Sequence, residues 1–143
     1  MSLITLHYVV PGDDFTRAGE ASGNVKTHLK KLGFNPAITR NVVIALYEAE
    51  INMVIHAGGG EIDVEIDPDQ IRMVLTDHGP GIPDVALAMQ EGYSTAPDNV
   101  RALGFGAGMG LPNIKKYTDD MQIETEIGVG TTMRLSQIHK NSS

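Results

Sequence analysis

Hydrophobic and polar residues alternate over the first stretch of the chain and then change to a helical spacing. Apolar side chains occupy every second position from Ile4 to Tyr8, which is the period of a β-strand, and Pro11-Gly12 ends this pattern. Mixed polar and apolar residues then predict a helix over about residues 15–32, with Gly33 as its C-terminal residue.

A second helix and two hairpins follow. Asn35 can cap a helix that begins at Pro36 and continues to Ala57, before three glycines. Period-two alternation predicts the strands of the hairpins, and a short helix is expected between them. The expected elements are strands 62–66 and 71–75, a helix over about 112–117, and strands 123–127 and 131–135.

This order of elements predicts an α/β fold, a two-layer sandwich with helices on one face of a mixed, mostly antiparallel sheet. It does not suit a doubly wound parallel sheet. The dinucleotide fingerprint is also missing because Met109 stands where its last glycine would be, and no Gly-Lys-Ser/Thr of a Walker A loop occurs. The 143 residues are expected to form one domain.

The composition restricts the partners and the compartment. With 11 Lys and Arg against 18 Asp and Glu, and no basic stripe, a protein partner is expected and nucleic acid is not. No run of eighteen apolar residues occurs, so no membrane segment is expected. The chain has no Cys, which excludes disulfides and favours the cytoplasm. With no Cys and with its five His scattered, a transition-metal site is not expected.

Three polar residues interrupt the apolar second helix. Glu48, Asn52 and His56 stand four residues apart, so they share one face of the helix. A carboxylate in line with an amide offers the hard oxygen ligands that a magnesium phosphate group requires, with a base beside them. The alternative is a solvated helix face with no chemical role.

A second candidate follows the strand that ends near Leu75. Asp77-His78-Gly79-Pro80-Gly81 places a carboxylate at a strand end, where it can accept from the exocyclic amine of adenine but not from the acceptor that guanine presents. Gly79 and Gly81 would allow a ring to lie against the backbone. An Asp-initiated turn with no ligand is the alternative.

The third candidate is a glycine-rich segment. Glycines at 104, 106, 108 and 110 precede Leu111 and the short helix. Backbone N–H groups that lead into a helix can hold an anion such as a phosphate. A flexible hinge is the alternative.

Together these pieces resemble the GHKL family of ATPases. The stretch from Tyr47 to His56 is similar to the N box of that family, the stretch from Asp77 to Gly81 to its D-x-G-x-G box, and the stretch from Gly106 to Leu111 to its G-x-G-x-G-L box. Gly130-Thr131 matches the final Gly-Thr element. The small size, with Glu48 four residues before Asn52, points to the anti-sigma-factor and switch-type serine-protein kinases of bacterial partner-switching systems.

This resemblance implies a Bergerat-type ATP-binding fold and a set of roles. Glu48 would be the general base and Asn52 the Mg2+ ligand, while Asp77, assisted by Thr131, would bind adenine. The remaining implied nucleotide-binding residues are Gly79, Gly81, Gly104, Gly106, Gly108, Gly110 and Leu111. The segment over about 82–105 would be a lid, and the role of His56 stays open.

The resemblance also implies an activity, although two residues differ from the pattern of the family. The implied activity is an ATP- and Mg2+-dependent serine/threonine protein kinase acting on an anti-sigma-factor-antagonist-type protein. The alternative is a nucleotide-gated module that binds a sigma factor or another regulator with little or no phosphotransfer. A homodimer is compatible with the sequence, which does not determine the oligomeric state. Glu50 and Met53 stand where small or Thr-like residues are expected beside Asn52. These larger side chains are expected to change the environment of the magnesium site and how tightly it binds Mg2+.

Overall fold

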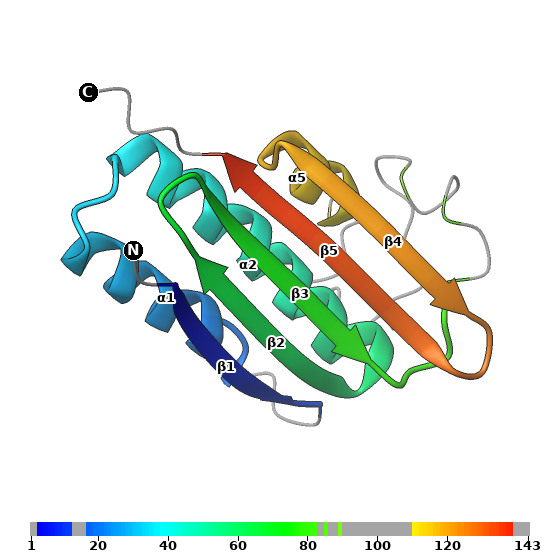
Figure 1. The fold of residues 1–143 in the computed structure, drawn as a ribbon. Helices are drawn as coiled ribbons and strands as arrows, with labels where there is room; N and C mark the ends of the chain where they lie inside the picture. Colours follow the sequence, from blue (N-terminus) through cyan, green and yellow to red (C-terminus); the bar gives the residue numbers. More distant parts are fainter. Residues whose placement is uncertain (1–2, 13–16, 83–84, 86–88, 90–109, 139–143) are drawn as a thin grey trace.

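The computed structural model describes residues 3–12, 17–82, 85, 89 and 110–138 (Figure 1). The described part contains three helices and five strands. In chain order they are β1 (Ile4–Pro11), α1 (Glu20–Lys31), α2 (Pro36–Ala57), β2 (Gly59–Ile66), β3 (Gln70–Asp77), α5 (Gly110–Lys116), β4 (Asp120–Glu126) and β5 (Gly130–Ile138).

The five strands form one sheet in the order β1-β2-β3-β5-β4. All neighbouring strands in the described part of the chain are antiparallel. Both predicted hairpins are present, as β2–β3 and β4–β5. The order places β5, the last described strand, between β3 and β4, so that Asp77 at the end of β3 lies opposite Thr131.

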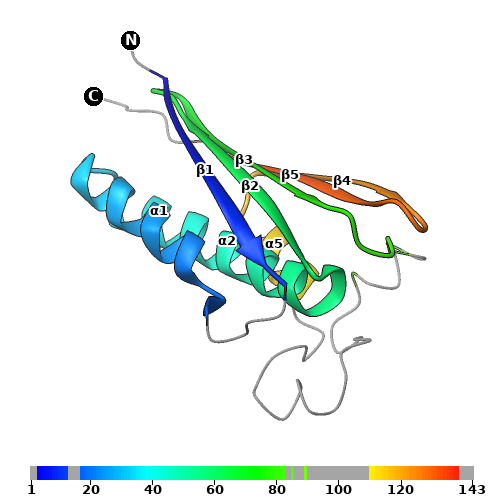
Figure 2. The ribbon, with the colours of Figure 1, turned by 90° about the horizontal axis from the view of Figure 1, so that it is seen from below.

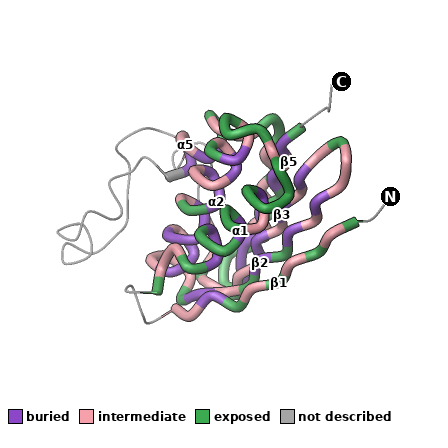
Figure 3. The backbone as a smooth tube through the Cα atoms, turned by 90° about the vertical axis from the view of Figure 1, so that its left-hand side faces the viewer, coloured by how far each residue is buried: buried purple, intermediate pink, exposed green. Residues whose placement is uncertain are grey.

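The helices lie together on one face of the sheet, which confirms the predicted two-layer α/β architecture (Figure 2). Alternate residues of β2 and β3 face the helices and are buried, as the period of two requires (Figure 3). The core between the layers includes Val25, Leu29, Val42, Leu46, Ile62, Val64, Ile71, Met73, Ile114 and Leu135.

The start of the first helix differs from the prediction. Residues 13–16 lie outside the described part, and α1 begins only at Glu20. Gly19 has a φ of 102°, a left-handed conformation that excludes it from the interior of a helix, and it is the residue directly before α1. The predicted continuous helix from about residue 15 is therefore wrong at residues 18 and 19, which form a turn before α1.

The start of the second helix is as predicted. The Asn35 side chain accepts a hydrogen bond from the backbone N–H of Ala37 at 2.8 Å, and Pro36 occupies the first helical turn. Gly58 ends the helix with a φ of 71°. α2 thus spans Pro36–Ala57 and crosses the centre of the helical layer (Figure 1).

Candidate functional site

Asp77 is the last residue of β3, and its carboxylate is fixed through one oxygen. Oδ1 accepts from the backbone N–H of Gly79 at 2.9 Å and from that of Thr131 at 3.1 Å. Within the described part of the chain, no group donates to Oδ2. The carboxylate is thus oriented by the protein and keeps one oxygen as an acceptor for a ligand.

The loop after Asp77 is attached to the β4–β5 hairpin. Gly128 N–H donates to the carbonyl oxygen of Pro80 at 2.9 Å, and Ile82 N–H donates to Thr125 Oγ1 at 2.8 Å. Thr125 Oγ1 also lies 2.9 Å from the hydroxyl oxygen of buried Thr131. These bonds join segments far apart in sequence and hold the loop in one position.

Gly79 and Gly81 are required by the packing of this loop. A Cβ at Gly79 would lie 2.6 Å from Cα of Ala57, at the end of α2. Gly81 has a φ of +83°, and a Cβ there would lie 2.7 Å from the carbonyl oxygen of Glu126. Both glycines therefore bring the loop against α2 and the hairpin, and contact with a nucleotide ring remains a prediction.

Glu48 lies in the middle of α2 and is half-buried. Burial raises the pKa of its carboxyl group, and a hydrogen bond with the side chain of Asn113 on α5 opposes this shift. A carboxylate whose pKa is raised toward neutral is a better proton acceptor at working pH than an ordinary one. The neighbouring helix therefore supplies a partner for Glu48 that the sequence pattern did not indicate.

Asn52 and His56 continue the same face of α2 toward its C-terminal end. Both are half-buried. Within the described residues, the side-chain amide of Asn52 has no hydrogen-bond partner, so its oxygen is available as a ligand. Burial lowers the pKa of His56, which favours the neutral imidazole.

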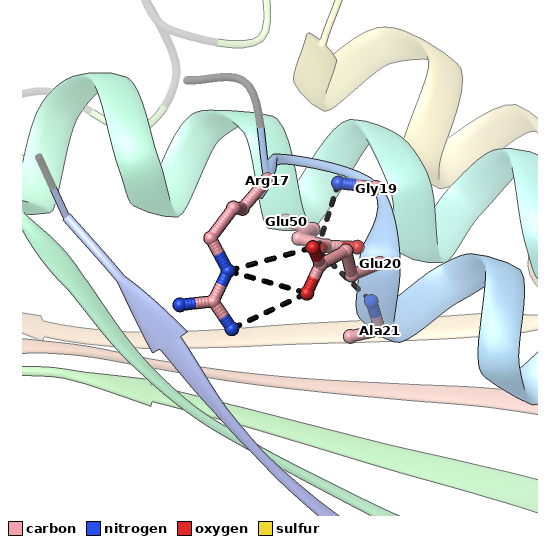
Figure 4. A network of polar contacts seen from close by, with 5 residues as sticks. All are labelled: Arg17, Gly19, Glu20, Ala21 and Glu50. Carbon is pink, nitrogen blue, oxygen red and sulfur yellow. Dashed lines mark hydrogen bonds and ion pairs between the residues drawn. The ribbon is translucent and has the colours of Figure 1, made fainter. Parts of the chain in front are cut away.

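Glu50 was expected to change the environment of the magnesium site beside Asn52. The structure instead places it away from the helix face that carries Glu48 and Asn52. Its carboxylate points to the start of α1 and is only 2% exposed (Figure 4). It accepts from the backbone N–H groups of Gly19, Ala21 and Ser22 at 2.9, 3.2 and 3.0 Å. Because two residues correspond to a rotation of about 200° around a helix, Glu50 faces away from Glu48.

Met53 also lies away from that face. It belongs to the hydrophobic core and is buried. Its sulfur occupies the space that a side chain at Gly60 would need, because a Cβ there would lie 2.9 Å from Met53 Sδ. Met53 therefore fills the core beside β2 and does not change the environment of the Asn52 side chain.

The glycine-rich candidate falls mostly outside the described residues. Gly104, Gly106 and Gly108 lie there, as does nearly all of the predicted lid over 82–105. Gly110 begins α5, and Leu111 is buried against the core. Neither the phosphate-binding role of these glycines nor the movement of the lid is tested by the described part, and both stay predictions.

Comparison with known proteins identifies the family. The family model described as a histidine kinase-like ATPase domain matches residues 14–137. The chain belongs to this family. The match confirms the resemblance inferred from the sequence motifs.

Relatives of this ATPase domain include proteins named as a serine/threonine-protein kinase and as anti-sigma factors, the branch of the family that the motifs indicated. The serine/threonine-protein kinase RsbT of Bacillus subtilis (strain 168) is 30% identical over 125 residues, covering 85% of this chain and 86% of RsbT. The anti-sigma F factor of Clostridium botulinum (strain Eklund 17B / Type B) is 31% identical over 103 residues, covering 68% of each chain.

Solved structures show the same fold at lower identity. The RsbU and RsbW domains of Rv1364c from Mycobacterium tuberculosis match with a TM-score of 0.60 and 17% identity, over 94% of this ATPase domain and 32% of that chain. The mycobacterial sensor histidine kinase MprB matches with a TM-score of 0.55 and 16% identity, over 96% and 99% of the two chains. No helix among the described residues is long and apolar enough to cross a membrane.

Proposed function

We propose that this chain is an ATP-dependent serine/threonine protein kinase that phosphorylates an antagonist-type regulatory protein in a partner-switching pathway. The observation that carries the proposal is Glu48, a half-buried carboxylate with a raised pKa on the same helix face as Asn52. The 30% identity to a relative named as a serine/threonine-protein kinase supports the same activity.

Asp77 is proposed to recognise the adenine ring. Its free Oδ2 can accept from the exocyclic amine, whereas the guanine oxygen at this position would face a second acceptor. Two backbone N–H groups hold Oδ1, so the carboxylate is oriented before a ligand arrives. Thr131, whose N–H is one of these donors, keeps Asp77 in place and is proposed to contribute to the adenine site.

The far end of the nucleotide is proposed to lie near Asn52 and Glu48. Ala57 contacts the loop at Gly79, and Glu48 is nine residues earlier, about 13 Å along the helix axis. This length accommodates an extended nucleoside triphosphate between the two ends. The Asn52 oxygen suits Mg2+, which neutralises phosphate charge when bound, and the glycines from 104 to 110 are proposed to hold the phosphates.

Glu48 is proposed to act on the hydroxyl group of the protein substrate. As the Ser or Thr oxygen forms its bond to the γ-phosphorus, the bond between that phosphorus and the bridging oxygen of ADP breaks. The hydroxyl proton passes to the Glu48 carboxylate. The raised pKa of Glu48 favours this transfer because the proton acceptor is stronger than an ordinary carboxylate.

The similarity to anti-sigma F factors favours one alternative, a nucleotide-gated module that binds a sigma factor. In this alternative the chain binds ATP through Asp77 but transfers no phosphate. Such a module would have no use for a proton acceptor at Glu48, so the two functions differ in their dependence on this residue.

A transfer assay with labelled ATP tests the proposal. The chain is incubated with Mg2+ and with candidate antagonist-type proteins, and phosphorylated Ser or Thr is identified by mass spectrometry. Calorimetry with ATP and GTP, on the wild type and Asp77→Ala, tests adenine recognition separately, since a lost buried acceptor costs about 1 to 3 kcal/mol. Nucleotide binding without any phosphorylated partner would reject the kinase and retain the binding module. Equal affinity for ATP and GTP would reject the role of Asp77.

A further inference from the structure

Exposed basic residues gather where α1 ends and α2 begins, at the end of the helical layer opposite the C-terminal end of α2 (Figure 1). We call Lys26, Lys30, Lys31 and Arg40 the basic corner; all four are exposed. Residues 21–47 contain no Asp or Glu, although the chain as a whole has 18 acidic residues and 11 Lys and Arg. The corner is therefore a local positive surface on an acidic protein.

Arg40 differs from the other arginines of the described part. Arg17 pairs with Glu20 at 3.3 Å, Arg72 with Asp67 at 2.8 Å, and Arg134 with Glu124 at 2.6 Å. Arg40 and the three lysines of the basic corner form no ion pair with any described residue. The charge of the corner is thus left for solvent or for another molecule.

Helix stabilisation explains only part of this surface. Lys30 and Lys31 lie in the last turn of α1, where positive charge interacts favourably with the helix dipole. Arg40 lies near the start of α2, where acidic residues would be favourable, yet the first turn of α2 contains none. Lys26 and Lys30, four residues apart, repel each other. The fold therefore gains little from Arg40 and Lys26.

An apolar side chain lies within the basic corner. Leu32, directly after Lys31, is 46% exposed. Phe34 and Ile38, which follow it, pack against the hydrophobic core and are only partly buried. A large exposed apolar residue next to Lys31 offers contact area as well as charge, a combination found in protein interfaces.

We propose that the basic corner is a docking surface for an acidic patch on a protein partner. A protein is favoured because the rest of the chain carries all 18 acidic residues, so an extended polyanion such as nucleic acid would be repelled beyond the corner. Arg40 precedes Glu48 by eight residues, about 12 Å along α2. A partner that contacts Arg40 therefore lies about two helical turns from Glu48 on the same helix. The inference does not depend on kinase activity.

Binding of a short helical peptide rich in Glu and Leu tests the docking surface without nucleotide. Fluorescence anisotropy gives the affinity, and amide shifts in two-dimensional NMR give the location. We expect the shifts to centre on residues 24–40 and the affinity to fall about tenfold in Lys30→Glu/Lys31→Glu, since two attractive charge contacts become repulsive. The matched control, Lys115→Glu/Lys116→Glu, makes the same change in net charge at two adjacent exposed lysines in the last turn of α5 and should bind as the wild type does.

Two comparison ligands complete the test. A single-stranded oligonucleotide of the same net charge and phosphatidylcholine vesicles containing phosphatidylserine are expected to bind more weakly than the peptide. Tighter binding of either one at residues 24–40 would overturn the protein-docking assignment. If the control double variant loses as much peptide affinity as Lys30→Glu/Lys31→Glu, the assignment is also overturned. The loss would then be caused by the change in net charge and not by the position of Lys30 and Lys31. Circular dichroism confirms that each variant is folded.

Discussion

Glu48 and Glu50 are two residues apart on α2, yet they face different neighbours. Glu50 faces α1, is almost fully buried, and accepts three backbone hydrogen bonds. Glu48 faces α5, is half-buried, and has one identified side-chain partner, Asn113; burial raises its pKa. The two carboxylates therefore differ both in burial and in the number of groups that donate to them.

The difference lies in how completely each carboxylate is partnered. Three donors compensate the cost of burying Glu50, so this residue can act as a cap for a helix that is far away in sequence. Glu48 is left with capacity to accept a proton or a hydrogen bond from a ligand. The comparison predicts that removing Glu50 affects stability, and that removing Glu48 affects chemistry.

The largest effect is expected for Glu48→Gln. A general base contributes about 10²- to 10⁴-fold to rate, so phosphotransfer should fall by this factor while Mg-ATP binding stays nearly normal. Because burial raises the pKa of Glu48, the folded state binds its proton more tightly than the unfolded chain, and ionisation above the ordinary pKa of 4.5 costs stability. Gln removes that cost, so the melting temperature at neutral pH should not fall. Single-turnover kinetics measure the phosphotransfer rate, calorimetry the affinity for Mg-ATP, and thermal unfolding the melting temperature.

Glu50→Leu should mainly reduce stability. The substitution leaves three backbone N–H groups at the start of α1 without their acceptor, which should lower the free energy of unfolding by about 3 kcal/mol. Glu50→Gln keeps one acceptor oxygen and should lose less. Urea unfolding followed by circular dichroism measures both. If Glu50→Leu is as stable as the wild type, the capping role is wrong.

A smaller effect is expected for Asn113→Ala. The Asn113 hydrogen bond lowers the pKa of Glu48, so its loss should let that pKa rise further. The acid side of the pH–kcat profile should then move to higher pH, since Glu48 must be ionised to accept a proton. Lys116→Ala on the same helix is the control and should leave the profile in place. An unchanged profile in Asn113→Ala would mean that the bond does not tune Glu48.

The smallest effect concerns Asp63, a carboxylate on the open face of the sheet. Its hydrogen bond of 2.6 Å to His7 raises the pKa of His7 above 6.5. This raised pKa contributes stability below the unfolded pKa of His7, and the contribution is lost as pH rises through the folded pKa. Asp63→Asn should therefore flatten the pH dependence of unfolding near this range. Screening by solvent keeps the effect small, and urea titrations at several pH values measure it.

Local patterns were sufficient for most of the fold. The capping of α2 by Asn35 and the period-two alternation of the hairpins depend on neighbouring residues, and the structure confirms both. The start of α1 was predicted wrongly because it depends on Glu50, whose carboxylate binds Gly19 from 31 residues away. Contacts at such separation have no signature in the local sequence.

The candidate site divides in the same way. The positions of Asp77 and of the Glu48–Asn52 face follow from a strand end and from helical spacing. The contact between Glu48 and Asn113, and the bonds from Thr125 to the loop after Asp77, depend on how α5 and the second hairpin pack. Sequence reasoning therefore identified the candidate residues, including Thr131 as a partner of Asp77, but not the contacts that Asn113 and Thr125 make.

The placement of β5 beside β3 has a consequence for synthesis of the protein. Asp77 is oriented by Thr131, which is 54 residues later in the chain, and the strand that contains Thr131 ends at Ile138. A nascent chain on the ribosome therefore exposes the edge of β3 until almost the whole domain has emerged. We expect the adenine site to form only after β5 has left the ribosome, so that nascent chains that lack this strand neither bind ATP nor compete with the folded domain for its partner.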